Sequence, residues 1–245
     1  SELVRKLHWS ILKRLYRLRP RFAVYQRLER RWLLDNRNWI DQQLIIRRPY
    51  EVAQIARCRA LIREHRLQSF FDIGANFGLY SVLLARETGV AEVHAFEPLP
   101  RNANQLRANL FLNDLDGRVL VRNQAVGDHA GWCELFVDPG STGVSTLIPD
   151  ESHRDQRAYQ SVVAVEAVVF DEQFAPSGTR ALVKIDVEGA ELQVLRGMSR
   201  FLADNQVVLQ VETTPGTQQA VEALLTGAGY RALDRIGADA YYANL

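Results

Sequence analysis

Residues 69–78 read Ser-Phe-Phe-Asp-Ile-Gly-Ala-Asn-Phe-Gly, an apolar run that reaches Asp72 and then turns through two glycines. The run predicts a buried strand, because short apolar segments bounded by turn residues are typical of strands inside a sheet. Gly74 and Gly78 allow a sharp turn into a helix whose first N–H groups are free to meet a ligand. A dinucleotide-binding turn would read G-x-G-x-x-G. Here the spacing is G-x-x-x-G, with Asn76 where the second glycine would admit a pyrophosphate, which argues against NAD or FAD.

Segments of strand and helix character alternate through the rest of the chain. The predicted strands are 69–74, 91–97, 118–123, 181–187 and 207–212, with a terminal pair at 230–234 and 240–244. The predicted helices between them are 79–86, 101–113, 191–202 and 217–228. Strands separated by helices form parallel crossover units in a sheet that helices cover on both faces. The sequence therefore predicts an α/β fold with a mostly parallel sheet.

One stretch departs from this alternation. Residues 132–137 and 161–169 have strand patterns, and they flank residues 138–159, which are rich in Gly, Ser, Thr, Pro and charge. A connection this long and this polar is typical of a functional loop. We therefore expect residues 138–159 to form a loop over a binding site.

The composition is that of a folded chain with an uneven distribution of charge. The 245 residues are 47% hydrophobic and 24% charged, which fits one domain with an appendage and excludes a disordered or collagen-like chain. Residues 1–66 hold 17 basic and 6 acidic residues, a net charge of +11, whereas residues 67–245 hold 13 and 23, a net charge of −10. A basic segment on an acidic body either meets an anionic partner or packs against that body.

Residues 3–18 predict an amphipathic helix that ends before Pro20. The residues of its apolar face recur at steps of three and four: Val4, Leu7, Ile11, Leu15 and Leu18. Apolar residues opposite Lys and Arg are typical of a helix that lies on an anionic membrane surface. The alternative is that this face packs against the body or, in a homo-oligomer, against a second copy of the chain.

Two more helices are predicted before the first strand, at 22–35 and at 51–67. The first of them carries its large apolar residues on one face: Tyr25, Leu28 and Trp32. The chain thus divides into a basic helical extension, residues 1–66, and a body, residues 67–245, that holds the binding site.

Targeting features and cysteines indicate a cytoplasmic protein. No stretch reaches the roughly 18 uninterrupted apolar residues that a transmembrane helix needs, and no secretory signal is visible. Cys58 and Cys133 are too few for a disulfide framework or a four-cysteine zinc site, so we expect free thiols in a reducing compartment. The helix at 3–18 would then make its membrane contact at the inner, cytoplasmic face.

Two further strand ends carry polar residues that suit a nucleoside. Glu97 lies 19 residues past Gly78, where an acidic residue accepts hydrogen bonds from ribose hydroxyls. Its alternative role is to cap the helix that follows Pro98. The next strand ends in Asn123-Gln124-Ala125-Val126, whose polar groups could pair with an adenine edge or simply end a strand. With the Asp72 carboxylate able to reach an amino group, these sites together describe S-adenosylmethionine.

The segment Lys184-Ile185-Asp186-Val187-Glu188-Gly189-Ala190-Glu191 closes the fourth predicted strand and opens a helix. Lys184 is the only lysine after residue 13 and lies in an apolar strand, so its charge needs a partner. Asp186 or Glu188 could serve only as that partner. Yet carboxylates at the carboxyl end of a strand lie where this class of sheet binds ligands, and Gly189 allows a close approach. We therefore expect a functional site here.

The motifs DIGANFGLYS, AFEP, AVGD and KIDVEGAELQVLRGM, in this order and spacing, resemble the FkbM-type family of S-adenosylmethionine-dependent methyltransferases. The resemblance covers about residues 69–213, and KIDVEGAE followed by VLRG is its most specific part. It implies a Rossmann-like class I methyltransferase fold, with a seven-stranded, mostly parallel sheet and an antiparallel strand near the edge. It also implies O-methylation, often of sugar hydroxyls in polysaccharides or natural products.

The resemblance also assigns residues to the cofactor and to the reacting methyl. The methionine part would meet Asp72, Gly74, Asn76 and Gly78, the ribose Glu97 and Pro98, and the adenine Gln124 and Ala125. Asp186–Glu188 would face the transferred methyl, with Asp186 also on the cofactor side. Residues 1–66 lie outside the resemblance, so the family implies nothing about them.

Methyl transfer to an alcohol requires positioning and a base. The acceptor oxygen must lie in line with the methyl and the sulfur, and a general base must take the proton of this weak nucleophile. The candidate bases are Asp186, Glu188 and Glu212, at the ends of adjacent strands, and more loosely His153 in the polar loop. Such carboxylates could also bind Mg²⁺, which would lower the pKa of the alcohol, although no sequence feature requires a metal.

The expected acceptor is a sugar hydroxyl of a polysaccharide, a lipid-linked glycan or a glycosylated natural product. Nucleic-acid methylation is a second reading of the sequence that the basic extension would suit. However, sites that methylate base amino groups usually carry Asp/Asn-Pro-Pro-Tyr/Phe to stack a flipped base, and here the strand end reads Asp-Val-Glu-Gly, so we expect no nucleic-acid partner. The sequence is also compatible with a different small-molecule acceptor or with a non-catalytic adaptor, and the intact glycine turn with Glu97 argues against the adaptor.

Overall fold

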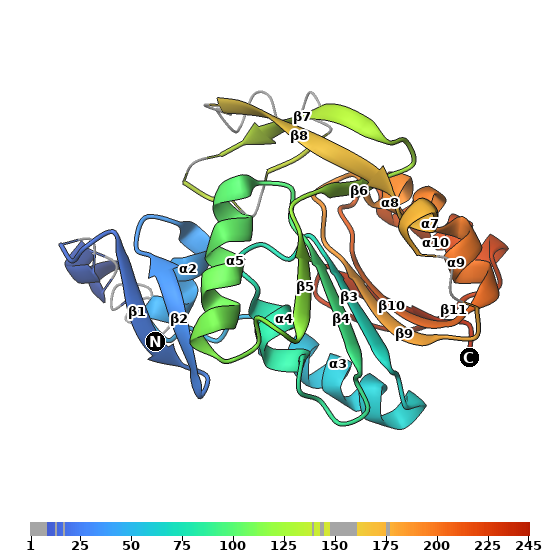
Figure 1. The fold of residues 1–245 in the computed structure, drawn as a ribbon, viewed down its shortest axis with the longest axis horizontal. Coiled ribbons are helices and arrows are strands. Elements are labelled where there is room, and N and C mark those ends of the chain that lie inside the picture. The colour runs from blue at the N-terminus through green and yellow to red at the C-terminus, as the bar shows by residue number, and fades with distance from the viewer. Residues whose placement is uncertain are drawn as a thin grey trace.

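The computed structural model describes residues 9–12, 14–16, 18–138, 140–142, 145–147, 161–174 and 177–245 (Figure 1). Within these residues, the centre of the fold is a seven-stranded sheet in the order β11-β12-β10-β9-β3-β4-β5. Its strands are β3 (Ser69–Ile73), β4 (Glu92–Phe96), β5 (Val119–Arg122), β9 (Arg180–Ile185), β10 (Gln206–Glu212), β11 (Arg231–Ile236) and β12 (Asp239–Ala243). Strand β12 runs antiparallel to both of its neighbours, and the other pairs are parallel. The predicted seven-stranded, mostly parallel sheet with an antiparallel strand near its edge is confirmed.

The strand order creates a crevice at the carboxyl ends of β3 and β9. The chain first moves from β3 outward to β4 and β5, and later builds β9 and β10 on the other side of β3. Crossovers therefore leave β3 in opposite directions, and in open α/β sheets ligands bind at such a switch point. The parallel register sets Asp72 beside Lys184 and Ile73 beside Ile185, so motifs that lie far apart in the sequence meet at one edge of the sheet.

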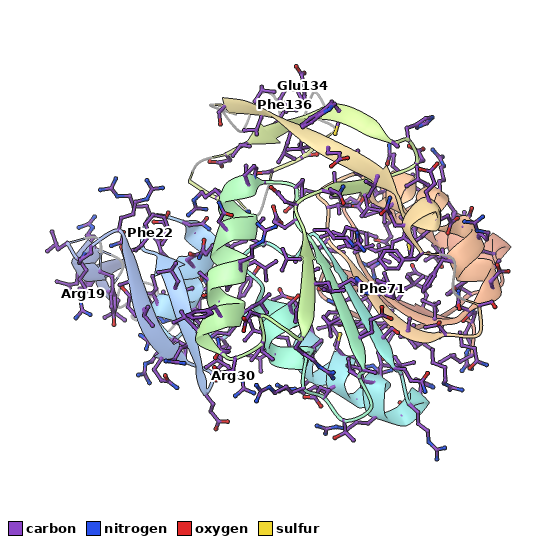
Figure 2. The ribbon with its side chains drawn as sticks, viewed as in Figure 1. Arg19, Phe22, Arg30, Phe71, Glu134 and Phe136 are labelled. Carbon is purple, nitrogen blue, oxygen red and sulfur yellow. The ribbon has the colours of Figure 1, made fainter. Side chains whose placement is uncertain are left out.

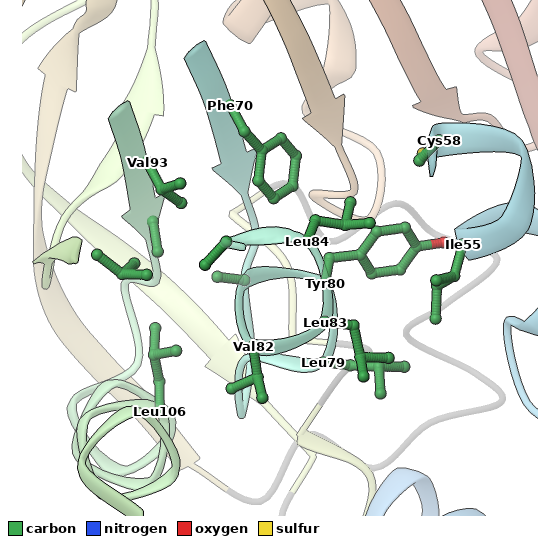
Figure 3. Packing of buried hydrophobic residues seen from close by; sticks show 14 of the residues in the cluster. Ile55, Cys58, Phe70, Leu79, Tyr80, Val82, Leu83, Leu84, Val93 and Leu106 are labelled. Atoms are coloured by element: carbon green, nitrogen blue, oxygen red, sulfur yellow. The ribbon is translucent and has the colours of Figure 1, made fainter. Parts of the chain in front are cut away.

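Helices cover both faces of the sheet, because successive strand residues point to opposite sides. Phe71 lies in an aromatic cluster on one face, with its ring 5.1 Å from that of Phe170 and 5.2 Å from that of His94 (Figure 2). Phe70 points to the other face and packs among residues of α3 and α4 (Figure 3). The helices on the face of Phe71 are α7 (Phe170–Gln173), α8 (Glu191–Gly197), α9 (Ser199–Asp204) and α10 (Gln218–Gly227). Those on the face of Phe70 are α3 (Val52–His65), α4 (Leu79–Leu84) and α5 (Pro100–Leu112).

One predicted helix is divided in two. The prediction of a single helix at 191–202 is wrong, because the backbone leaves helical angles at Met198 (φ −121°, ψ 20°) and α9 begins afresh. The Asp171 carboxylate accepts hydrogen bonds from the backbone N–H groups of Arg200 (2.7 Å) and Phe201 (2.8 Å), so it satisfies the first turn of the new helix. No helix among the described residues is long and apolar enough to cross a membrane.

The N-terminal extension contains a hairpin where a helix was predicted. The strands are β1 (Phe22–Arg27) and β2 (Arg30–Asp35), joined by a turn in which Leu28 and Glu29 have φ values of 49° and 57°. Such left-handed turn residues match the twist of a two-residue hairpin. Tyr25 pairs with Trp32 on the buried side, whereas Val24 is exposed, so the burial alternates with period two and the predicted helix at 22–35 is wrong.

The rest of the extension is helical. Of the predicted helix at 3–18, residues 9–12 and 14–16 are helical and Leu18 lies in a turn, whereas residues 1–8, 13 and 17 lie outside the described residues. Helix α2 (Trp39–Ile45) was not predicted, and α3 confirms the helix predicted at 51–67. The extension shares one hydrophobic cluster with the body, through residues such as Trp32, Leu34 and Ile45.

A small second sheet lies beyond β5. Its strands, in the order β6-β8-β7, are β6 (Ala125–Gly127), β7 (Gly131–Val137) and β8 (Ser161–Val169). The strands predicted at 132–137 and 161–169 are confirmed, and β6 was not predicted. Of the loop predicted at 138–159, residues 138, 140–142 and 145–147 are described, and His153 lies outside the described residues.

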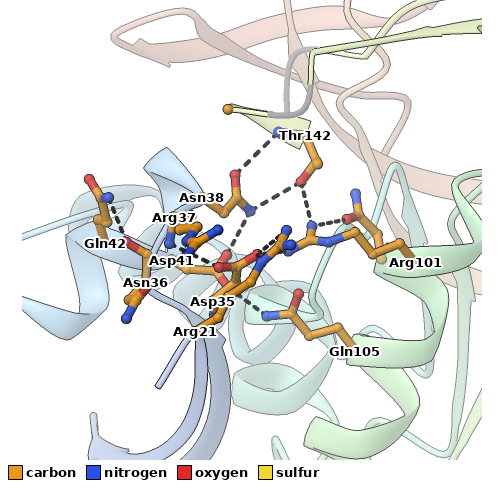
Figure 4. A network of polar contacts seen from close by, with 12 residues as sticks. Arg21, Asp35, Asn36, Arg37, Asn38, Asp41, Gln42, Arg101, Gln105 and Thr142 are labelled. Carbon is orange, nitrogen blue, oxygen red and sulfur yellow. Dashed lines mark hydrogen bonds and ion pairs between the residues drawn. The ribbon is translucent and has the colours of Figure 1, made fainter. Parts of the chain in front are cut away.

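A buried polar network joins the extension to the body (Figure 4). The Asp41 carboxylate accepts hydrogen bonds from Asp35 N (2.6 Å), Asn38 Nδ2 (2.8 Å) and Gln105 Nε2 (2.6 Å). Burial nevertheless raises the pKa of Asp41 to about 6. The Asn38 side chain also donates to Thr142 Oγ1 (3.1 Å) and accepts from Thr142 N (3.2 Å). The network therefore fixes α2 against both α5 and the polar loop.

Candidate active site

A cavity of about 430 Å³ lies at the carboxyl ends of β3, β4, β9 and β10. Most of the predicted site residues line it: Gly74, Asn76, Glu97, Pro98, Gln124, Ala125, Asp186, Glu188 and Glu212. Two others do not. Asp72 is fully buried beneath the turn, and Gly78 lies where α4 packs against α5. The fold thus brings the glycine turn, Glu97 and the strand end at Gln124 and Ala125 to one cavity. The carboxylates of Asp186, Glu188 and Glu212 line the same cavity.

The glycine turn forms the floor of the cavity. Gly74 has a φ of +83°, and a Cβ added there would lie 1.8 Å from the carbonyl oxygen of Asp186. Only glycine allows this close approach of two strand ends. At Gly78 an added Cβ would lie 2.3 Å from Leu106 Cδ1, so that glycine serves helix packing. The Oδ1 atom of Asn76, which lines the cavity, is buried and has no hydrogen-bond partner among the described residues.

Glu97 has both of the roles that its sequence position suggested. Its Oε1 atom accepts a hydrogen bond from Leu99 N (3.0 Å) at the start of α5, and its Oε2 atom accepts one from Asn76 N (2.8 Å). Burial raises the pKa of Glu97 to about 7, although these hydrogen bonds oppose the rise. Oε1 also accepts a hydrogen bond from Asn102 Nδ2 (3.5 Å), so Oε2 is the oxygen that keeps a further lone pair for a ligand hydroxyl.

The end of β5 supports Glu97 from behind. Asn123 Nδ2 donates to the backbone carbonyls of Glu97 (2.8 Å) and Pro98 (2.9 Å), so its side chain holds two strand ends together. Gln124 lines the cavity while its Nε2 atom donates to Glu166 Oε2 (2.8 Å). Ala125 begins β6 beside them.

Lys184 is the cation of the carboxylate cluster. Its Nζ atom is buried 3.0 Å from Asp186 Oδ2 and 4.8 Å from the centre of the Tyr80 ring. Burial lowers the pKa of Lys184, but the carboxylates of Asp186 and Asp72 raise it more, so the net shift is upward and the ammonium stays charged. Of the two partners that the sequence left open, Asp186 makes the ion pair.

Asp72 faces away from the cavity. Its Oδ2 atom accepts hydrogen bonds from Ser81 Oγ (2.7 Å) and Ser81 N (3.1 Å) in α4. Burial raises the pKa of Asp72, and the nearby Lys184 opposes that rise. In this geometry its carboxylate anchors α4 through Ser81 and places a negative charge near Lys184 from beneath the cavity floor.

Glu212, at the end of β10, forms a close acid pair with Asp186. The Asp186 charge and then burial raise the pKa of Glu212 to about 10. This rise favours the protonated form of Glu212, which is a hydrogen-bond donor beside Asp186. Glu188 also lines the cavity, in a turn where its φ is 51° and its backbone carbonyl accepts a hydrogen bond from Thr146 Oγ1 (2.7 Å).

The extension contributes residues that the sequence did not mark as functional. Tyr50 and Glu51 line the cavity, and Glu51 Oε2 accepts a hydrogen bond from Tyr80 Oη (2.7 Å). Burial and then the charge of Glu51 raise the pKa of Tyr50, so its hydroxyl remains protonated. Trp39 lines the mouth, is 44% exposed, and meets the Tyr50 ring edge-on at 6.2 Å. No sequence motif marks Trp39, Tyr50 or Glu51 as functional. They reach the cavity because of how the hairpin and the loops of the extension fold.

The described residues hold no group of three or more His, Cys, Asp or Glu side chains arranged to bind a metal ion. The charge of the cluster is instead offset by Lys184. Both cysteines are free thiols, as predicted, and the buried Cys58 Sγ donates to Gln210 Oε1 (2.9 Å) behind the site.

Comparison with known proteins assigns the family. A model of the methyltransferase FkbM domain matches residues 72–232. The chain belongs to the FkbM methyltransferase family. It is therefore an S-adenosylmethionine-dependent methyltransferase, and the resemblance carried by its motifs is confirmed. The family match begins at Asp72, so it leaves out the extension that supplies Trp39 and Tyr50.

Three relatives of this FkbM-family methyltransferase show the range of the similarity. Methyltransferase sdnD of Sordaria araneosa is 32% identical over 186 residues, covering 65% of this chain and 72% of the relative. The 31-O-demethyl-FK506 methyltransferase FkbM of Streptomyces tacrolimicus is 32% identical over 190 residues, covering 65% and 71%. The hexuronic acid methyltransferase AglP of Haloferax volcanii is 26% identical over 142 residues, covering 58% and 54%.

Proposed function

We propose that this enzyme transfers the methyl group of S-adenosylmethionine to a hydroxyl of a sugar. The observation that carries the proposal is the cluster of Asp186, Glu212 and Lys184 on the cavity wall. In that cluster Asp186 is held by a cation on one side and by a protonated carboxyl on the other. A fixed carboxylate is suited to receive the proton of an alcohol.

Three features of the cavity fit the cofactor. The backbone of the Gly74 turn lines the cavity, the buried Asn76 Oδ1 lacks a partner among the described residues, and Glu97 Oε2 keeps a lone pair. Glu97 would accept the ribose hydroxyls, Asn76 would meet the methionine part, and Gln124 with Ala125 would border the adenine. S-adenosylmethionine, when bound, supplies an electrophilic methyl on sulfur.

Asp186 would act as the general base. The hydroxyl proton of the acceptor would move to the Asp186 carboxylate as the oxygen–methyl bond forms and the sulfur–methyl bond breaks, which leaves S-adenosylhomocysteine, and the proton would later leave to solvent. Lys184 and Glu212 keep the carboxylate in place, because each contacts it from a different strand position. Glu188, across the same end of the cavity, is the second candidate. The charge of Asp186 and burial raise the pKa of Glu212, so Glu212 would act as a hydrogen-bond donor rather than as the base.

The walls beyond Asp186 suit a sugar ring. Trp39 presents an exposed aromatic surface at the mouth, and Ser141 and Thr142 of the adjoining loop add polar groups. An aromatic face with nearby hydroxyls can hold a ring that has an apolar side and polar edges. The name of AglP, a hexuronic acid methyltransferase, agrees with a sugar acceptor.

A second acceptor class is a hydroxyl of another small natural product. The relative named for 31-O-demethyl-FK506 favours it, because that name places the methyl on an oxygen of such a compound. Asp186 would take the hydroxyl proton in the same way from either class of acceptor.

Three variants test the role of the carboxylates: Asp186→Asn, Glu188→Gln and Glu212→Gln. The matched control is Glu134→Gln, on the exposed surface of β7. We expect Asp186→Asn to lower methyl transfer by roughly 10²–10⁴-fold, while its affinity for S-adenosylhomocysteine stays within a few fold. The assay uses radiolabelled S-adenosylmethionine with hexuronic-acid glycans, neutral glycans and a cyclic polyol as acceptors.

The outcomes separate the proposals. Normal turnover by both Asp186→Asn and Glu188→Gln would place the base elsewhere. Transfer to the polyol but to no glycan would favour the second acceptor class. If calorimetry finds no binding of S-adenosylhomocysteine by the unaltered protein, the chain is a non-catalytic adaptor.

Trp39 is tested separately, because it touches only the acceptor side. Loss of an aromatic contact costs about 0.5–1.5 kcal/mol, so Trp39→Ala should raise KM for the glycan roughly two- to tenfold without changing kcat. Trp39→Phe should restore most of the loss, and the control Trp132→Ala, at an exposed tryptophan of β7, should have no effect. An unchanged KM in Trp39→Ala would exclude the stacking role.

A further inference from the structure

The outer surface of the N-terminal extension exposes a group of large apolar side chains. They come from the helical residues 9–12 and 14–16, the following turn and the β1 hairpin: Ile11, Leu15, Leu18, Phe22, Val24 and Leu28. Leu18 is 85% exposed, the most of any large hydrophobic residue in the part of the chain that the structure describes. We call these six residues the N-terminal apolar face.

The helix in this segment is apolar on two sides. Trp9, Leu12 and Tyr16 pack against the hydrophobic core, and the Tyr16 ring lies 6.0 Å from the Tyr25 ring. Ile11 and Leu15, four residues apart, point away from that core and are 50% and 56% exposed. The inner side of the helix therefore makes the contact with the body. That contact does not explain why the outer side, with Ile11 and Leu15, is also apolar.

The exposed charges of the N-terminal extension itself are almost all positive. Among the described residues from 9 to 48, the exposed arginines are Arg14, Arg19, Arg21, Arg31, Arg37, Arg47 and Arg48. Glu29 is the one exposed acidic residue of that described stretch, since Asp35 and Asp41 are buried. Figure 2 shows Arg19 and Phe22 together at the outer end of the extension.

We propose that the N-terminal apolar face docks on the surface of an anionic lipid bilayer. Aliphatic and aromatic side chains that enter the interface, surrounded by cations that meet lipid phosphates, are the two components of peripheral membrane binding. A symmetric dimer through the same face would bring the arginines of both copies together. A nucleic acid would pair with the arginines but leave the aliphatic side chains without a partner.

The docking face adjoins the cavity. The guanidinium carbon of Arg101 lies 5.7 Å from the centre of the Phe22 ring, and Arg101 Nη1 donates to Thr142 Oγ1 (3.2 Å). Thr142 lines the cavity. A docked enzyme would hold its acceptor side near the bilayer, which selects a lipid-linked glycan among the proposed sugar acceptors. This last step rests on the proposed function, whereas the docking itself does not.

Flotation of the full chain with vesicles tests the docking. Vesicles of phosphatidylcholine and phosphatidylglycerol at 3:1 are compared with phosphatidylcholine alone, at 50 and 500 mM salt. We expect the protein to float with the anionic vesicles at low salt only. Val24→Asp with Leu18→Asp should weaken binding at least tenfold, and Val162→Asp should not, although Val162 is as exposed (52%) as Val24 (55%).

A second variant, Arg14→Gln with Arg19→Gln, removes charge and leaves the apolar residues, and it should reduce flotation on its own. Circular dichroism melting checks that every variant is folded. Failure of the unaltered protein to float, or full flotation of Val24→Asp with Leu18→Asp, would overturn the proposal. So would binding of an oligonucleotide in place of vesicles, or a dimer that Val24→Asp dissociates. Loss of sugar methylation with intact flotation would instead refute only the proposed function.

Discussion

Replacing Lys184 by methionine should strongly destabilise the protein, because this one cation offsets several buried acids. Lys184 is 4% exposed, its Nζ atom lies 3.0 Å from Asp186 Oδ2, and the fully buried Asp72 is its neighbour across β3 and β9. Methionine fills a similar volume but leaves two carboxylates without their partner. Breaking a buried ion pair in this way costs about 3–5 kcal/mol.

An exposed ion pair provides the matched control. Arg63 Nη2 lies 2.8 Å from Glu87 Oε2, yet the Arg63 side chain is 64% exposed. Solvent screens such a pair, so Arg63→Met should cost less than about 1 kcal/mol. The assay is urea denaturation at pH 8, followed by circular dichroism, with the midpoints of the two variants compared with that of the unaltered chain.

The pH dependence of the stability deficit, the free energy of unfolding that Lys184→Met loses, provides an independent check. Burial already raises the pKa of Asp72 when Lys184 is present, and without Lys184 it should rise further. A carboxyl whose pKa is higher in the folded than in the unfolded state binds protons more tightly when folded, so it favours folding more as pH falls. The deficit should therefore shrink from pH 8 to pH 5, and adding Asp72→Asn should recover part of it. Equal costs for Lys184→Met and Arg63→Met, or a deficit independent of pH, would refute this reasoning.

The same geometry leads to three further predictions. Gly74→Ala should lower Tm by about 4–8 °C, since a left-handed backbone alone costs ~1–2 kcal/mol and its Cβ would strike a backbone oxygen, while Gly117→Ala, where nothing lies within 4 Å, should leave Tm unchanged. Affinity for S-adenosylhomocysteine should fall as pH drops below about 7, because protonated Glu97 loses an acceptor, and calorimetry on Glu97→Gln should find weak binding without that pH dependence. Iodoacetamide should modify the half-buried Cys133 in the folded protein and Cys58 only after unfolding, because Cys58 is buried and burial raises its pKa; early labelling of Cys58 would contradict this.

Local sequence determined the elements around the glycine turn. The run at 69–78 predicts a buried strand, a turn and a helix, and β3 and α4 form there because apolar burial and glycine's freedom at φ +83° agree. The position of Glu97 at the next strand end could also be predicted from the sequence alone. One crossover helix separates it from the glycine turn, so the number of residues between them is nearly fixed. Such features depend on residues close together in the chain.

The sequence pattern failed where two periods fit the same residues. Tyr25, Leu28 and Trp32 lie on one face of a helix, and the helix was predicted for that reason. The two-residue turn at Leu28 and Glu29 and the pairing of Tyr25 with Trp32 produce a hairpin instead. Burial of Trp32 and Leu34 against the body favours period two, and that burial exists only in the folded chain.

Tertiary structure alone decided which polar groups meet. Lys184 pairs with Asp186 because residues two apart in an extended strand share a face, while Glu188 lies beyond in a turn with a left-handed φ. Asp72 turns to Ser81 in α4, away from the cavity that its sequence position suggested. Trp39 lies at the cavity mouth because the hairpin and the buried polar network around Asp41 hold α2 there. Composition and spacing along a chain cannot specify such contacts, because they depend on how distant segments pack.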